Sequence, residues 1–141
     1  MSTGQQAVQE ALTWLDTPYH HQGRVKGVGV DCGTLICEVY EKVGLMDYLD
    51  PRPYPPDWHL HQMGQRYLEL ILGVCDPVEG PPQPGDIVLY QFGKCISHGA
   101  IVIDWPQVIH SYLHQGVIIQ DGTKGSLARR IAGFFRMKRL K

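Results

Sequence analysis

The sequence predicts an α+β fold in which N-terminal helices pack on a C-terminal antiparallel β-sheet. The first half carries apolar residues at helical spacing, whereas the second half carries short apolar runs separated by turn residues. A proline-rich stretch, EGPPQPGD at 79–86, separates the two patterns. Helices followed by strands are typical of an α+β domain, and we expect residues 1–141 to form one domain.

Three helices are expected in the first half, over residues 3–15, 32–43 and 57–72. Thr3 and Gln6 fit a capping box at the start of the first helix. Gly44 suits a left-handed cap at the end of the second. Between these two helices, residues 19–31 are expected to form a loop punctuated by glycines.

Five strands are expected in the second half, over residues 87–90, 99–104, 107–112, 116–120 and 131–139. They are short, rich in β-branched residues and separated by turn residues. Because consecutive strands of this kind pair with one another, an antiparallel sheet is expected.

Charge and hydropathy argue against several classes of function. The net charge is -1, so the chain as a whole has no attraction to nucleic acid or to an anionic membrane. Basic residues gather after Asp121 without any acid, but no aromatic-interleaved motif accompanies them, so a solvated or docking surface is favoured over a nucleic-acid site. No apolar run approaches the ~20 residues that span a bilayer, and the N-terminus does not match a secretory signal. We therefore expect synthesis in the cytoplasm without membrane insertion.

The four cysteines, Cys32, Cys37, Cys75 and Cys95, form no C-x-x-C pair. A structural zinc site is therefore not expected, and neither is any other metal or cofactor. Without an export signal, the thiols are expected to stay reduced.

Cys32 stands where the glycine-rich loop turns into the second helix. Unpaired backbone N–H groups and the helix dipole favour an anion there, which would lower the pKa of the thiol. The same N–H groups could stabilise the oxyanion formed when a thiolate attacks a carbonyl. A cysteine on the apolar side of a helix is more often a core residue, as Cys37 illustrates. The position of Cys32 alone leaves both interpretations open.

A nucleophilic cysteine needs a base, and the base needs an orienting group. His98 begins one expected strand and His110 lies in the next. A two-residue turn between them would pair residue 98 with 113 and place His110 on the opposite face, because side chains alternate along a strand. A three-residue loop would pair residue 98 with 112 and bring both histidines onto one face. Catalysis by this pair therefore requires the odd-length loop or an equivalent bulge.

Two segments resemble the NlpC/P60 family of cell-wall cysteine peptidases. TPYHHQGRVKGVGVDCGTLICEVYEKVGL is similar to the segment that carries the family's catalytic cysteine, and QPGDIVLYQFGKCISHGAIVIDWPQVIHSY is similar to its histidine block. YPPDW and RRIAGFFR resemble the short phage-encoded branch of the family. One departure is Gly33-Thr34-Leu35, because the family usually has Ser-Gly-Leu after the cysteine.

The resemblance implies a papain-like NlpC/P60 fold and roles for individual residues. Cys32 becomes the nucleophile, His98 the general base and His110 the group that holds the imidazole of His98. Asp31 also suits a purely structural role at the N-terminus of the helix. The candidate substrate-binding residues are Tyr19, His21 and Asp31.

The implied function is hydrolysis of amide bonds in peptidoglycan stem peptides, at a γ-D-glutamyl to diamino-acid linkage. The phage-like features predict an enzyme of the virion tail that acts at the cell wall, with peptidoglycan peptides and other phage tail proteins as partners. Two alternatives remain open. One is a tail-tip assembly protein with a vestigial site, and the other is a thiol amidase or acyltransferase on another substrate.

Overall fold

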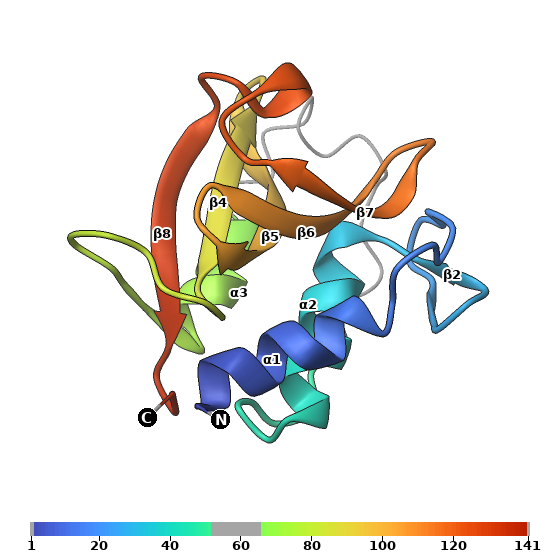
Figure 1. The fold of residues 1–141 in the computed structure, drawn as a ribbon, viewed down its shortest axis with the longest axis horizontal. Helices are drawn as coiled ribbons and strands as arrows, with labels where there is room; N and C mark the ends of the chain where they lie inside the picture. Colours follow the sequence, from blue (N-terminus) through green and yellow to red (C-terminus); the bar gives the residue numbers. More distant parts are fainter. Residues whose placement is uncertain (1, 52–65, 141) are drawn as a thin grey trace.

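The computed structural model describes residues 2–51 and 66–140. Its elements follow the order helices first, sheet afterwards (Figure 1). They are α1 (Thr3–Leu12), β1 (Arg24–Val25), β2 (Gly29–Val30), α2 (Cys32–Lys42), α3 (Arg66–Leu72), β3 (Cys75–Pro77), β4 (Ile87–Phe92), β5 (Cys95–Asp104), β6 (Gln107–Tyr112), β7 (Gly116–Asp121), a 3-10 turn (Gly125–Leu127) and β8 (Ile131–Met137).

The main sheet has six strands in the order β3-β8-β4-β5-β6-β7, and every neighbouring pair is antiparallel. The three helices lie together beside this sheet (Figure 1). The expected α+β fold, with N-terminal helices on a C-terminal antiparallel sheet, is therefore confirmed. Within the described ranges, no helix is both long and apolar enough to cross a membrane.

The two faces of the sheet carry separate apolar clusters. One cluster contains helix residues, such as Leu35 of α2, together with alternate strand residues, such as Ile101 of β5. The other lies on the opposite face, where Leu127 packs on neighbours that include Tyr90 and Ala100. This alternation along each strand is what a sheet buried on both faces requires.

The first helix begins and ends differently from the prediction. Ser2 is the N-cap and forms the capping box with Gln5, so the expected pairing of Thr3 with Gln6 is wrong. Thr3 is already helical, whereas Ser2 has the extended backbone that lets its side chain reach the free N–H groups. The helix ends at Leu12 rather than at residue 15.

The second helix agrees with its prediction, and the third is partly described. Helix α2 ends at Lys42, one residue before the expected end, and Gly44 has a φ of 80°. Helix α3 covers the last part of the expected helix over 57–72. Residues 57–65 lie outside the described residues, and so does the YPPDW segment.

Three short strands were not predicted. The expected loop at 19–31 contains the two-stranded ladder of β1 and β2, and β3 pairs with β8 at the edge of the main sheet. Each of these strands has only two or three residues, so none of them shows an alternating pattern that would predict it.

The register of β5 against β6 decides where the two histidines lie. Ile101 pairs with Ile109 and Val102 with Val108, which is the register that brings residue 98 level with 112. The connection is nonetheless a two-residue turn, because a β-bulge between Val102 and Asp104 absorbs the extra residue. His98 and His110 therefore lie on the same face. The bulge fulfils the condition that the sequence analysis set for catalysis by this pair.

Candidate active site

A chain of three polar side chains crosses β5, β6 and β7. His98 Nε2 lies 2.7 Å from His110 Nδ1, and His110 Nε2 lies 3.0 Å from Gln120 Oε1. Gln120 is oriented in turn by its amide nitrogen, which donates to the carbonyl oxygen of Lys124 at 3.2 Å. The amide oxygen of Gln120 can only accept, so His110 carries its proton on Nε2 and accepts at Nδ1.

This chain also fixes the tautomer of His98. Because His110 Nδ1 accepts, His98 Nε2 must donate to it. A neutral His98 then carries its lone pair on Nδ1, the nitrogen that faces away from His110. The arrangement produces a base with a defined free nitrogen.

Both imidazoles are buried and neutral. Their exposed fractions are 7% for His98 and 1% for His110. Burial, and next the neighbouring His110, hold the pKa of His98 well below its usual 6.5. Burial lowers the pKa of His110 to about 4, although its hydrogen bond with Gln120 acts in the opposite direction.

Aromatic rings hold His98 in place. The ring of Tyr112 meets it edge-on with centroids 5.4 Å apart, and Phe92 does so at 5.8 Å. Tyr90 lies at 6.0 Å in a tilted arrangement. Edge-to-face packing of this kind restricts rotation of the imidazole and excludes water from around it.

The segment that leads into α2 docks where β5 and β6 separate. Among the described residues, the register pairs of β5 with β6 begin at Ile101. Ser111 of β6 donates its hydroxyl to the carbonyl oxygen of Val30 at 2.7 Å. Two residues later, the thiol of Cys32 donates to the carbonyl oxygen of Ser97 at 3.8 Å. The first residue of α2 is thereby placed against the strand that carries His98.

The sulfur of Cys32 is half-buried among hydrogen-bond donors. Burial is the main reason that the pKa of this thiol rises to about 12, and the negative charge of Asp31 adds to the rise. Hydrogen bonds from the backbone of Gly99 and from the hydroxyl of Tyr67 act in the opposite direction. The predicted lowering of the pKa by the helix terminus is therefore wrong, because desolvation and a neighbouring carboxylate outweigh it.

Asp31 caps α2 and ties the loop to it. Its carboxylate accepts from the backbone N–H of Thr34 at 2.9 Å and from that of Gln22 at 2.8 Å, and it is 2% exposed. Thr34 returns the contact, since its hydroxyl accepts from the N–H of Asp31 at 3.0 Å. This reciprocal box explains what Thr34 contributes in the unusual Gly33-Thr34 sequence. The contacts support the structural alternative for Asp31, and its substrate-binding role stays a prediction.

The other two predicted residues lie near the start of α2. Tyr19 forms an isolated bridge with Val30, two residues before Cys32. Burial raises the pKa of the Tyr19 hydroxyl, and the charge that Cys32 would carry as a thiolate raises it further. His21 Nδ1 lies 3.9 Å from the carboxylate of Asp31. Whether Tyr19 and His21 contact substrate stays a prediction.

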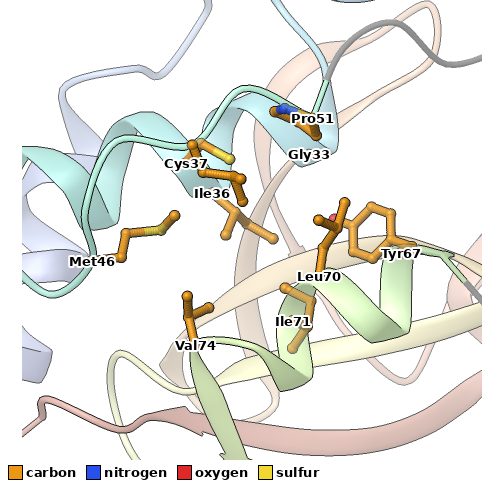
Figure 2. Close-up of a pocket in the computed structure, with 10 residues that line it drawn as sticks. Gly33, Ile36, Cys37, Met46, Pro51, Tyr67, Leu70, Ile71 and Val74 are labelled. Carbon is orange, nitrogen blue, oxygen red and sulfur yellow. The ribbon is translucent and has the colours of Figure 1, made fainter.

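A small apolar cavity of about 30 Å³ lies behind the helix start, between α2 and α3 (Figure 2). Gly33, Ile36 and Cys37 of α2 face Tyr67, Leu70 and Ile71 of α3 across it. Cys37 is thus a core residue, as the comparison with Cys32 assumed. Apart from the hydroxyl of Tyr67, the lining of this cavity is apolar.

Two residues of the site were missed from the sequence. Gln120 was read only as the end of a strand, because its contact with His110 depends on the register of β6 and β7. Tyr67 lies in the helix expected over 57–72, and the sequence does not reveal that its hydroxyl hydrogen-bonds to the sulfur of Cys32. Across the described residues, no group of three or more side chains is arranged to hold a metal ion.

The sequence profile of the NlpC/P60 family matches residues 16–136. Several solved structures share the fold. NlpC1 from Trichomonas vaginalis is 17% identical with a TM-score of 0.69, over 96% of this chain and 44% of that protein. An NlpC/P60 family protein from Bacillus cereus is 21% identical with a TM-score of 0.68, over 95% of this chain and 40% of that protein.

A third structure is matched along nearly its full length. It is the NlpC/p60 domain of the peptidoglycan hydrolase SagA, 20% identical with a TM-score of 0.62, over 94% of this chain and 97% of that domain. This chain spans less than half of the Trichomonas and Bacillus proteins. No curated protein matches the sequence. Because the family profile covers most of the chain, the chain belongs to the NlpC/P60 family.

Proposed function

We propose that this protein is a cysteine peptidase that hydrolyses amide bonds in peptidoglycan stem peptides. The observation that carries the proposal is the chain from Gln120 through His110 to His98, which leaves one free nitrogen on the strand where Cys32 docks. In this proposal Cys32 is the nucleophile, His98 the general base and His110 the residue that positions His98.

The first step begins from neutral groups. Burial disfavours both the thiolate and the imidazolium, so the resting site holds a thiol and a neutral imidazole. We expect His98 Nδ1 to take the thiol proton as the sulfur of Cys32 attacks the carbonyl carbon. The imidazolium then protonates the leaving amine, and a thioester remains on the sulfur.

The second step releases the acid. A water molecule attacks the thioester while His98 Nδ1 takes its proton, and the C–S bond then breaks as the imidazolium of His98 returns that proton to the sulfur, which restores the thiol. The backbone N–H of Cys32 at the N-terminus of α2 is a donor for the oxyanion in both steps, and the hydroxyl of Tyr19 is a second candidate donor. Asp31 contributes through the capping box that orients this terminus.

The proposal also specifies which amide bond is cut and where the enzyme acts. The γ-D-glutamyl to diamino-acid linkage is the proposed target because the cysteine and histidine segments resemble those of the family. The similarly folded domain of SagA belongs to a peptidoglycan hydrolase, which agrees with a wall substrate. The phage-like segments support a place in the virion tail, from which the enzyme would open the wall locally. Antibody labelling of purified virions from the source phage or prophage would test that place.

The test of the activity is cleavage of purified muropeptides, followed by mass spectrometry. Wild type is expected to release fragments cut between D-glutamate and the diamino acid, whereas Cys32→Ala should release none. Cys37→Ala is the matched control, because it removes a buried thiol of the same helix and should retain cleavage. Equal cleavage by wild type and Cys32→Ala would remove Cys32 from the mechanism. A folded wild type that binds muropeptides without cutting them would favour the tail-assembly alternative.

A further inference from the structure

A cleft with two arginines lies beside the histidine chain. It has a volume of about 410 Å³ and is lined by Gln91 and Gly93 from the end of β4, and by residues 128–131 at the start of β8. Its lining includes Arg129 and Arg130 and contains no carboxylate. The cleft therefore offers two guanidinium groups and a side-chain amide, which suit an anionic ligand.

The cleft is close to the proposed base. The guanidinium carbon of Arg130 lies 4.4 Å from the centre of the Phe92 ring, and that ring meets His98 edge-on. Tyr90 pairs with Ile131 on one side and with His98 on the other. The start of β8 is thus two strand spacings, or about 10 Å, from His98. That span is within reach of a short peptide bound at the sulfur.

Ion pairs within the described residues do not account for the charge of the cleft, although Arg130 lies over the ring of Phe92. Some other basic residues of the C-terminal third do form ion pairs, as Arg136 does with Asp86 and Arg139 does with Asp47. Within residues 2–51 and 66–140, no ion pair involves Arg129 or Arg130. Arg129 also has a φ of 63°, a conformation that costs a residue with a Cβ roughly 1 kcal/mol. An unpaired cation held in a costly conformation points to a role outside folding.

We propose that Arg129 and Arg130 bind a carboxylate of the peptide substrate, next to the bond that is cut. The inference rests on the proposed function, since it specifies the substrate of the same site. A γ-linked D-glutamyl residue uses its side-chain carboxyl in the scissile amide and leaves its α-carboxylate free. A guanidinium pairs with a carboxylate through two parallel N–H donors, so the cleft can select peptides that keep this charge.

Binding measured without cleavage tests the site. Cys32→Ala is titrated calorimetrically with two L-Ala-γ-D-Glu-diaminopimelate peptides that differ only at the α-position of glutamate, which is either carboxylate or carboxamide. The carboxylate peptide is expected to bind roughly tenfold more tightly, as a charge-assisted pair beside a partly desolvated ring allows. Adding Arg129→Gly and Arg130→Gln should bring the two affinities within about twofold of each other.

The variants separate a binding role from a folding role. Glycine suits the backbone of Arg129, so Arg129→Gly is expected to fold at least as stably as its parent. Arg139→Gln is the matched control, because it removes a surface arginine that is remote from the cleft and should preserve the tenfold preference. Equal affinities for the two peptides, no binding of either, or a preference unchanged by the cleft variants would overturn the inference. A clear preference in Cys32→Ala, together with no cleavage by wild type, would instead leave the site standing and refute the proposed activity.

Discussion

Gln120 illustrates how one amide sets the chemistry of a residue it does not touch. Its oxygen accepts from His110 Nε2, which makes His110 Nδ1 an acceptor and directs the proton of His98 to Nε2. No charge is involved, since burial keeps both imidazoles neutral. Gln120 therefore orients the two imidazoles and does not stabilise a charge on them.

We expect Gln120→Leu to lower kcat by roughly tenfold with little change in KM, because His110 loses the acceptor that selects its tautomer. Gln120→Glu keeps an acceptor and adds a negative charge, so it should retain more activity. The added charge should also raise the pKa of His110 and shift the acidic limb of the pH–rate profile to higher pH. Steady-state kinetics on a defined peptide between pH 5 and 8 would measure both effects. An unchanged kcat in Gln120→Leu would show that the tautomer is set elsewhere.

At the scale of elements, the start of α2 combines a structural cap with an electrostatic cost. Asp31 accepts two backbone N–H groups, which stabilises the helix start, and its charge raises the pKa of the adjacent thiol. The residue thus favours the fold and disfavours the thiolate. This opposition makes the two effects separable by substitution.

Asp31→Ala should lose about 1–2 kcal/mol in the free energy of unfolding, since it removes the cap. Asp31→Asn keeps a capping oxygen and should lose less. Both variants remove the charge, so both should lower the pKa of Cys32 and speed its alkylation by iodoacetamide at pH 8. The rate should rise roughly threefold for each unit by which the pKa falls, because nucleophilicity falls with it.

Peptide mapping would follow Cys32 separately from the other three thiols. Asp47→Asn is the control, because this exposed aspartate pairs with Arg139 at the surface and should leave the alkylation rate unchanged. Alkylation equally slow in wild type and in both Asp31 variants would exclude the electrostatic effect.

The elements differ in how far the sequence could predict them. Helix α2 and strands β4, β6, β7 and β8 follow patterns that are set by neighbours along the chain, and their bounds lie within two residues of the prediction. Strand β5 was also predicted, but it begins at Cys95, four residues before its expected start. Strand β3 has no such pattern, because it exists through its pairing with β8. The position of Cys32 followed from the start of a helix, and those of His98 and His110 from the alternation of side chains along strands. Placing the two histidines on one face depended on an odd-length loop or a bulge, and the bulge lies at Ile103. Gln120 and Tyr67 could not be predicted, since their contacts depend on register and on helix packing.

At the scale of the whole molecule, the histidine chain makes stability depend on pH. The folded protein holds His110 with a pKa of about 4, against 6.5 for an ordinary histidine. Below pH 6.5 the unfolded chain binds a proton that the folded protein does not, so the free energy of unfolding falls with pH until about pH 4. The same holds for His98, whose pKa is also lowered by burial.

We expect His110 alone to remove about 2 kcal/mol of stability between pH 7.5 and pH 5, because 1.5 units separate pH 5 from 6.5 and each unit corresponds to about 1.4 kcal/mol. Urea unfolding at the two pH values measures the loss. In His110→Gln, whose amide can still accept from His98, the loss should be smaller by that amount. His114→Asn is the control, since it removes an exposed histidine at a φ of 68° that asparagine tolerates, and it should keep the full loss. An equal loss in wild type and His110→Gln would show that folding does not lower the pKa of His110.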